Sequence, residues 1–400
     1  MAFDPKAATA RYIDSLGAAN LDKAHDYTVG GHWLLLWGIV VSAIVTWAIV
    51  RWGILDRLDR RIGERRRNLR AFLVSGAFIL LSTVITLPWT IYESWWREKS
   101  YGRTSQPLAD FLGQAGLAAA ISTLLTAVFM IGVYWLMRRT GKRWWLWSGG
   151  LAGIALAAVM LLAPIVIEPM FNKYEPVPPG QVRDALVSMA GRAGIPPNKI
   201  YMYNGSRQSN NFTANVSGIG SSARVAISDV AFKNASLDEV RAVTGHEIGH
   251  YVLKHIWYSV AFFAVLALFL FWLADRLFPR FARAFGSDAG IAEPRAVPVL
   301  LFLVSLFAIL ASPIINTLSR MQEAQADLYS LRTENRPDAL SSALVKTAEY
   351  RYPRPDPVQE AVFYDHPSVE RRVHTAMEWK ATHPEPPARR ARESKPQSEE

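Results

Sequence analysis

The hydrophobic residues of this chain are gathered into long runs instead of recurring at a fixed period. Six runs of 18 to 27 residues contain no Asp, Glu, Lys or Arg. A helix needs about 20 consecutive apolar residues to cross a bilayer, where it must satisfy its own backbone groups. The pattern therefore predicts a predominantly α-helical polytopic membrane protein. The runs are Trp33–Val50, Ala71–Tyr92, Phe111–Met137, Trp144–Ile167, Ile256–Ala274 and Val297–Leu318.

Buried helices of a large soluble protein could account for one or two such runs, but not for six. The composition agrees with the membrane interpretation, because 50% of the 400 residues are hydrophobic and tryptophans stand near several run ends. The net charge of +10 comes largely from arginines beside the runs, including the stretch RLDRRIGERRRNLR. Membrane topology explains such clusters, so we predict contact with the lipid bilayer and no nucleic-acid partner.

The runs divide the chain into alternating membrane and aqueous parts. Two polar blocks flank the last two spans, and the C-terminal tail is rich in proline and charge with almost nothing to bury, which predicts disorder. The predicted parts are an N-terminal segment (1–31), a four-span membrane region (32–168), a region that includes spans 256–274 and 297–318 (169–380), and the disordered tail (381–400).

The first polar block is typical of a small α+β unit. The stretch GQVRDALVSMAGRAG places Val182, Leu186 and Met189 on one helical face, and proline and glycine bound it at both ends. Two short segments, KIYMYN (199–204) and RVAISD (224–229), are typical of strands and are separated by polar, glycine-containing sequence. The block therefore predicts a helix followed by a pair of strands.

A helix carrying the segment TGHEIGH follows these strands. Ser236 and Glu239 form the S-x-x-E pattern of a capping box, which predicts the start of that helix. Residues four apart lie on one helical face, so His246 and His250 can bind one metal ion together. Glu247 projects beside them and can reach a water molecule on that ion. This pattern favours a site for water activation.

The alternative is a helix with two satisfied histidines and a solvated glutamate. The cap, the preceding strands and the small residues Gly245 and Gly249, which let another backbone approach, favour the metal site. The chain has no cysteine, so a transition-metal ion must be bound by histidine and carboxylate. A catalytic zinc needs a third protein ligand and one open position.

The segment SRMQEAQADLYSL, just after the last run, supplies carboxylates for the third position. Glu323 and Asp327 are four residues apart on one helical face. One of them can bind the metal while the other orients a ligand imidazole, and an exposed carboxylate pair is the alternative. Together with the strands and the histidine helix, these carboxylates predict a small zincin-type α+β metallopeptidase domain with one Zn²⁺ per chain.

These motifs resemble those of the type I CAAX prenyl protease family of integral-membrane zinc metallopeptidases. The likeness includes TGHEIGH and SRMQEAQAD with two spans between them, LPWTIYESWWREKSYGRTSQPLADFL, APIVIEPMFNKYEPVPPGQVR and the C-terminal motif DHPSVERRV. It covers roughly residues 20–380. The resemblance implies a membrane-integral zinc metalloendopeptidase that hydrolyses peptide bonds of membrane-associated polypeptides.

The resemblance also implies a role for each residue of the site. His246, His250 and Glu323 would be the zinc ligands. Glu247 would be the general base that takes a proton from the attacking water. Asp327 would be the partner that orients a ligand histidine.

Further residues are implied outside the ligand set. His366 and Arg372, in the DHPSVERRV motif, would stand near the developing oxyanion; the alternatives are that Arg372 pairs with a carboxylate and that His366 caps a turn. The stretch QSNNFTANV resembles the family's edge strand, with Asn210 and Asn211 binding substrate. Gln208 stands where the family usually has a histidine, so this stretch departs from the family pattern.

The remaining histidines lack ligand-like spacing. His255 lies at the membrane end of the ligand helix and off its ligand face, and we interpret it as an interfacial residue. His25, His32, His374 and His383 receive no role.

The expected substrates are polypeptides that are prenylated or otherwise anchored in the membrane. A membrane quality-control metalloprotease of the same chemistry is the main alternative. An inactive chaperone or scaffold is a weaker one, because every catalytic position is filled. A channel or transporter would need ionisable residues inside the spans, and the runs have essentially none.

The expected localisation is multi-pass integral membrane, in the cell membrane if the host is bacterial. Short loops on one side carry sixteen basic residues and those on the other carry six, which places the zinc domain outside the cytoplasm. The family resemblance implies a cytosolic zinc domain, and the family usually has seven spans where we count six. The sequence therefore leaves the side of the active site open.

Overall fold

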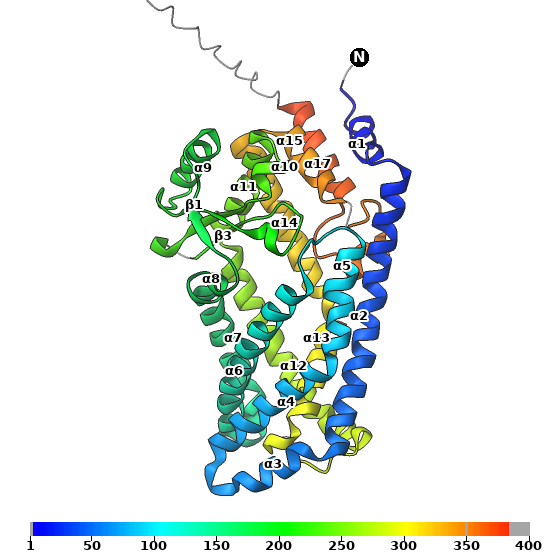
Figure 1. The fold of residues 1–400 in the computed structure, drawn as a ribbon, viewed down its shortest axis with the longest axis vertical. Helices are drawn as coiled ribbons and strands as arrows, with labels where there is room; N and C mark the ends of the chain where they lie inside the picture. The colour runs from blue at the N-terminus through cyan, green and yellow to red at the C-terminus, as the bar shows by residue number, and fades with distance from the viewer. Residues whose placement is uncertain (1–2, 219, 349–350, 384–400) are drawn as a thin grey trace, which may run out of the picture.

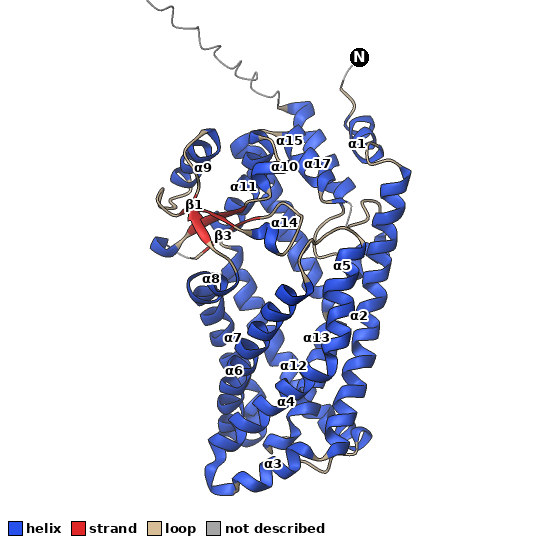
Figure 2. Ribbon diagram, in the orientation of Figure 1, coloured by secondary structure: helices blue, strands red, loops and turns tan. Residues whose placement is uncertain are grey.

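The computed structural model describes residues 3–218, 220–348 and 351–383. Long helices form a bundle at one end of the molecule, and short helices with a small sheet form a domain at the other (Figure 1). Figure 2 shows the strands gathered in that domain. This arrangement confirms the predicted fold class, a helical polytopic membrane protein with a small α+β domain.

The bundle helices coincide with the predicted apolar runs. Four helical stretches of the described chain are long and apolar enough to cross a membrane, and a bent pair makes a fifth if it is counted as one span. One of the four, 108–171, contains two of the predicted runs. The bundle helices are α2 (Ala18–Trp52), α4 (Arg67–Ile91), α6 (Leu108–Thr140), α7 (Trp144–Leu162), α12 (His255–Phe285), α13 (Val297–Leu310) and the first part of α14 (Ser312–Glu334).

Helices α6 and α7 form a hairpin. Gly132 in α6 and Leu151 in α7 lie on opposite sides of the Gly141–Arg143 turn, yet a Cβ on Gly132 would lie only 2.6 Å from Leu151 Cδ2. Contact between residues so placed requires the chain to reverse at the turn. The stretch 108–171 thus contains two antiparallel helices, as the two separate runs predict.

The last predicted span is bent by 54° between its two helices. Pro313 occupies the first turn of α14, where its missing N–H needs no helical partner. It cannot donate to the carbonyl four residues earlier, so α13 ends at Leu310 and the chain changes direction. The sequence predicted one continuous run, and the proline explains the difference.

The sheet has four short strands in the order β1-β2-β4-β3. Strands β2 and β4 pair in parallel, whereas β1 and β3 pair antiparallel with β2 and β4. The strands predicted at 199–204 and 224–229 are confirmed as β2 and β4. Strand β1 was not predicted, and β3 lies at the sheet edge. Their bounds are β1 (Tyr174–Pro176), β2 (Ile200–Tyr203), β3 (Ala214–Ser217) and β4 (Arg224–Ser228).

Most of the shorter helices lie in the domain that holds the sheet, whereas α3 lies at the opposite end of the bundle (Figure 1). The helix predicted within GQVRDALVSMAGRAG is confirmed as α9, with Leu186 and Met189 buried and Val182 packed against the same cluster. The remaining helices are α1 (Pro5–Asp14), α3 (Ile54–Ile62), α5 (Arg97–Ser100), α8 (Glu168–Phe171), α9 (Gln181–Arg192), α10 (Ala231–Asn234), α11 (Leu237–Val252), α15 (Pro337–Lys346), α16 (Pro357–Phe363) and α17 (Val369–Thr382).

The two ends of the folded chain meet in this domain. Ile13 of α1 and Val373 and Met377 of α17 belong to one buried cluster with residues of α15, and Figure 1 shows α1 beside α17. The predicted disordered tail, 381–400, lies outside the described residues from 384 onward. The N-terminal segment is therefore packed against the part of the chain that carries His366 and Arg372.

Candidate metal centre and active site

Helix α11 begins where the capping pattern predicts. Ser236 is the N-cap, its side chain accepts from the Glu239 backbone N–H, and the Glu239 carboxylate accepts from the Ser236 N–H. The helix then carries His246 and His250 on one face. The ring planes stand at 74° with centroids 4.8 Å apart, so both rings point to one region of space.

Helix α14 lies beside α11 and brings a carboxylate to this region (Figure 1). Glu323 Oε2 lies 3.2 Å from His246 Nε2, and Glu323 Oε1 lies 3.3 Å from His250 Nε2. Ligand atoms of the three residues all lie within 4.8 Å of one another. The structure thus brings together the three side chains that the family resemblance implies as ligands.

These residues fit a divalent cation. Glu323 Oε2 is buried and has no hydrogen-bond partner of good geometry among the described residues. The Nε2 atoms of His246 and His250 face each other at 3.1 Å, although two lone pairs in that arrangement repel. Two imidazoles and one carboxylate are a donor set typical of zinc enzymes that keep one position open.

The carboxylate of Asp327 contacts Nδ1 of His246, the ring nitrogen that does not face Glu323. The Asp327 Oδ1 atom lies 2.9 Å from His246 Nδ1, which leaves His246 Nε2 to face Glu323. Arg372 donates to both carboxylate oxygens of Asp327, from Nε and Nη2, each at 2.7 Å. The Arg372 side chain is 11% exposed, so this bidentate pair is largely shielded from water. This geometry matches the alternative interpretation of the sequence, in which Arg372 pairs with a carboxylate.

His366 faces the same carboxylate as the two histidines of α11. Its Nε2 lies 3.3 Å from Glu323 Oε2, and its Nδ1 lies 2.8 Å from Asp365 Oδ1. The side chain is 29% exposed and lines the cavity that contains His246 and Glu247. The N-cap of α17 is Ser368, so His366 does not cap that helix.

Glu247 stands on the wall of a cavity of about 230 Å³. Burial raises the pKa of its carboxyl above the usual range, while His246, His250 and Arg372 act in the opposite direction. A raised pKa makes a carboxylate a better proton acceptor near neutral pH. The cavity places this acceptor beside the three candidate ligands.

Asn210 and its neighbour are placed against a loop of the membrane region. The Asn210 backbone N–H donates to Arg103 O at 2.9 Å, and its side chain contacts Gly102 O and Ser105 Oγ. The Asn211 backbone N–H donates to Ser209 Oγ. Neither asparagine lines the cavity at Glu247, so substrate binding by them stays a prediction.

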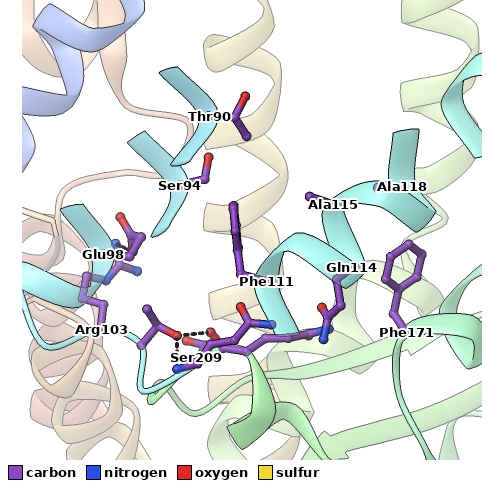
Figure 3. Close-up of a pocket in the computed structure, with 13 residues that line it drawn as sticks. Thr90, Ser94, Glu98, Arg103, Phe111, Gln114, Ala115, Ala118, Phe171 and Ser209 are labelled. Carbon is purple, nitrogen blue, oxygen red and sulfur yellow. Dashed lines mark hydrogen bonds and ion pairs between the residues drawn. The ribbon is translucent and has the colours of Figure 1, made fainter. Parts of the chain in front are cut away.

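A second cavity, of about 410 Å³, adjoins the same loop. Figure 3 shows Glu98 and Arg103 on one side of it and Gln114 and Phe171 on the other. Gln208, the residue in the family's usual histidine place, donates to Gln114 Oε1 at 2.8 Å. Gln208 therefore links the first polar block to α6, and it has no contact with the candidate metal ligands among the described residues.

Sequence reasoning missed the residues that line the metal-side cavity from the sheet. Phe212 and Thr213, just before β3, and Ala214, its first residue, lie there. The signal was present, because QSNNFTANV resembles an edge strand and β3 is an edge strand. The sequence did not indicate that the cavity lies beside the residues after Asn210 and Asn211 instead of beside the two asparagines.

The burial of His255 contradicts its interpretation as an interfacial residue. The residue is only 4% exposed, and its Nδ1 lies 2.9 Å from His250 Nδ1. The interpretation of an interfacial residue off the ligand face assumed that the ligand helix continues through it. The helix instead ends at Val252, and a new one begins at His255.

Two known protein families match this chain. Residues 176–392 match peptidase family M48, and residues 6–173 match the CAAX prenyl protease N-terminal region, described as five membrane helices. The described part of that second segment holds four long bundle helices, α2, α4, α6 and α7.

Similar proteins span almost the whole chain. The metalloprotease YhfN of Bacillus subtilis (strain 168) is 27% identical over 90% of this chain and 85% of its own length. The CAAX prenyl protease 1 homolog of Arabidopsis thaliana is 25% identical over 89% and 85%. CAAX prenyl protease 1 of Saccharomyces cerevisiae is 27% identical over 76% and 71%.

A solved structure shows the same fold. The crystal structure of S. mikatae Ste24p matches with a TM-score of 0.75 at 19% sequence identity, and the match covers 94% of this chain and 95% of that one. The family match covers more than half of the chain and contains all three candidate ligands. The chain belongs to peptidase family M48 and is a multi-pass integral-membrane metallopeptidase.

Proposed function

We propose that this protein is a zinc-dependent endopeptidase that cuts membrane-associated polypeptides, with His246, His250 and Glu323 as the ligands of one Zn²⁺. The observation that carries the proposal is the convergence of these three side chains, in which the buried Oε2 of Glu323 accepts no hydrogen bond of good geometry from the described residues. A bound zinc would supply a Lewis acid and a water of pKa about 7.

Glu247 is the general base in this proposal. Its carboxylate accepts the proton of the attacking water and passes it to the leaving amine. Burial on the cavity wall supports this role, because it raises the pKa of the carboxyl toward that of the water.

His366 is the better placed of the two proposed oxyanion donors. Its Nε2 points toward the cavity, 3.3 Å from Glu323 Oε2, and can donate to a developing negative charge. Such a donor typically contributes about 3–4 kcal/mol to transition-state stabilisation. Arg372 has its Nε and Nη2 engaged by Asp327, so in our proposal it acts mainly by holding Asp327 against His246.

The substrate is proposed to bind as an extended strand. Among the described strands, β3 pairs with β4 alone, and its first residue and the two residues before it line the cavity beside Glu247. Main-chain pairing with such an edge aligns a peptide while tolerating varied side chains. The CAAX prenyl proteases among the similar proteins support prenylated or membrane-anchored chain ends as the substrate class.

One assay separates the substrate classes. The purified full-length protein in detergent is given a farnesylated CAAX peptide or unfolded casein, each with and without a chelator. We expect chelator-sensitive cleavage of the farnesylated peptide. Cleavage of casein alone would favour a quality-control protease and overturn the substrate class only.

The matched variant for the chemistry is Glu247→Gln. The amide is nearly isosteric but cannot accept the proton of the water at neutral pH, so hydrolysis should fall to background while zinc stays bound. His246→Ala should instead lose the zinc. Full zinc retention in His246→Ala, or substantial turnover by Glu247→Gln, would overturn the corresponding assignment.

A further inference from the structure

His250 contacts a second imidazole on the side that faces away from Glu323. Its Nδ1 lies 2.9 Å from Nδ1 of His255, and Nε2 of His255 lies 3.0 Å from Oε1 of Gln325. The rings of His250 and His255 meet edge to face, with centroids 5.0 Å apart. Three side chains from three helices therefore form a continuous hydrogen-bonded relay that ends at a candidate ligand.

The direction of this relay follows from proton counting. The amide oxygen of Gln325 only accepts, so His255 carries its proton on Nε2 and presents a lone pair at Nδ1. His250 must then carry its proton on Nδ1, which leaves the lone pair of Nε2 facing Glu323. The reverse order would put a proton on His250 Nε2 and prevent it from binding a cation.

A backbone break makes the contact of the two rings possible. At 3.6 residues per turn, positions 250 and 255 of one continuous helix would point about 140° apart. The chain instead breaks at Lys254, which has φ 59°, in the left-handed region. That conformation is energetically unfavourable for a non-glycine residue, so its surroundings must hold it there.

Helix α14 holds the first turn of α12 in place. Gln322 Nε2 contacts the His255 carbonyl oxygen at 3.4 Å and Ser259 Oγ at 3.2 Å. Gln325, one turn further along α14, is exposed and reaches His255 at its outer side. The helix that supplies Glu323 thus also fixes the residue that touches His250.

We propose that His255 is a positioning residue that fixes the tautomer and ring orientation of His250, and that Gln325 fixes His255 in turn. This inference rests on the proposed role of His250 as a zinc ligand. The two ligand histidines are then held in different ways. His246 is backed by a charged pair, Asp327 with Arg372, and His250 by a neutral relay.

The test compares two substitutions of His255 in the full-length protein in detergent. Asparagine can place its side-chain oxygen near the Nδ1 position and keep an acceptor for His250, whereas phenylalanine keeps the ring shape and removes the acceptor. Loss of such an outer partner typically lowers metal affinity by about 10- to 100-fold. We expect that loss for His255→Phe, measured by chelator competition, and much less for His255→Asn.

A spectroscopic readout separates orientation from packing. In the cobalt-substituted protein, His255→Phe should shift the visible ligand-field bands, and His255→Asn should restore them. Gln325→Leu should shift the same bands in the same sense, while Gln325→Glu, which keeps an acceptor, should not. His25→Phe, on a side chain that is 53% exposed, is the matched control and should change nothing.

Two results would overturn the inference. The first is a His255→Phe protein with wild-type zinc affinity and cobalt spectrum. The second is an equal loss in His255→Phe and His255→Asn, which would mean that packing matters and the acceptor does not. His250→Ala distinguishes these from failure of the proposed function, because zinc retention in His250→Ala would remove His250 from the ligand set itself.

Discussion

Two helix pairs in this molecule use glycines four residues apart for different purposes. Helix α11 places Gly245 and Gly249 against α14 in the polar domain, and helix α7 places Gly149 and Gly153 against α12 in the bundle. In both pairs the missing Cβ atoms let two helix backbones approach closely. What differs is the set of side chains that the approach brings together.

In the polar domain, close approach aligns polar groups. A Cβ on Gly249 would lie 3.1 Å from the Ala326 Cα, and one on Gly245 would lie 2.9 Å from Ser330 Oγ. Ala326 stands between Glu323 and Asp327 on α14. The spacing of α11 and α14 therefore sets the distance between the histidines and the carboxylates.

In the bundle, the atoms that the two glycines approach are apolar. A Cβ on Gly149 would lie 2.3 Å from Leu268 Cδ2, and one on Gly153 would lie 2.8 Å from Ala264 Cβ. The contact is tighter than that of α11 with α14, but no candidate site residue lies in it. Two glycines four residues apart can therefore fix either the geometry of a site or the packing of a bundle, depending on the partner helix.

Gly249→Leu should have the largest effect, because it acts on the contact between α11 and α14. The new side chain meets Ala326 and Tyr329, so α11 and α14 must separate by more than a relaxation of side chains. Displacement of a site by about 1 Å can cost about 100-fold in rate, and we expect at least that loss together with loss of zinc. Metal analysis and peptide hydrolysis on the purified protein measure both.

Gly191→Leu is the control for that variant. It lies in helix α9 of the same domain, and a Cβ there meets nothing within 4 Å. It should keep both zinc and activity. A zinc-loaded and active Gly249→Leu protein would show that the spacing of α11 and α14 does not set the site.

Arg372→Met tests the contact that holds Asp327 in the polar domain. Asp327 would lose its bidentate partner and its hold on His246, so zinc affinity should fall by about 10- to 100-fold. A donor to the oxyanion would behave differently, because its loss lowers kcat and kcat/KM while zinc binding stays unchanged. Zinc titration and steady-state kinetics on one preparation decide between the two roles.

Gly149→Ala tests the packing of α7 against α12 in the bundle. The added methyl group meets the Leu268 side chain and its Cα at 2.9 Å, and overpacking of this kind typically costs about 1–3 kcal/mol. We expect a lower melting temperature with unchanged zinc content and turnover per folded molecule. Gly150→Ala is the control, since a Cβ there meets nothing within 4 Å. Zinc loss in the folded Gly149→Ala protein would contradict the separation of packing from chemistry.

Local patterns predicted much of the fold and part of the site. The apolar runs predicted the bundle helices because a membrane span is specified by its own composition. The cap at Ser236 and the spacing of His246 and His250 were readable for the same reason, since each involves residues within one or two turns.

Other features depend on contacts that no local pattern specifies. Strand β1 has three residues, one of them proline, and it forms only because β2 lies beside it. Lysine has no preference for the left-handed region, so the break at Lys254 and the inward turn of His255 could not be foreseen. The pairing of Arg372 with Asp327 joins residues 45 positions apart, and the sequence offered it only as an alternative.

A double-mutant cycle between Gly245 and Ser330 tests the contact of α11 with α14 at a single point and has the smallest expected effect. A methyl group on Gly245 would meet Ser330 Oγ at 2.9 Å and Glu334 Cγ at 3.2 Å, so Gly245→Ala should destabilise the protein by about 1–3 kcal/mol. Ser330→Ala removes the hydrogen bond from Ser330 Oγ to Ala242 O, at a typical cost of about 1 kcal/mol.

The double variant should be more stable than the sum of the two losses predicts. Removing the hydroxyl opens the space that the new methyl group needs, so we expect a favourable coupling of about 0.5–1 kcal/mol, within the range for residues in contact. Gly249→Ala combined with Ser330→Ala is the control, because the nearest atoms to a Cβ on Gly249 belong to Ala326 and Tyr329, and those two losses should add. Denaturant titration of the four proteins in each cycle gives the coupling. Simple additivity for Gly245 and Ser330 would mean that α11 and α14 can move apart freely at this point, and the spacing of the two helices would then have to be set at Gly249 alone.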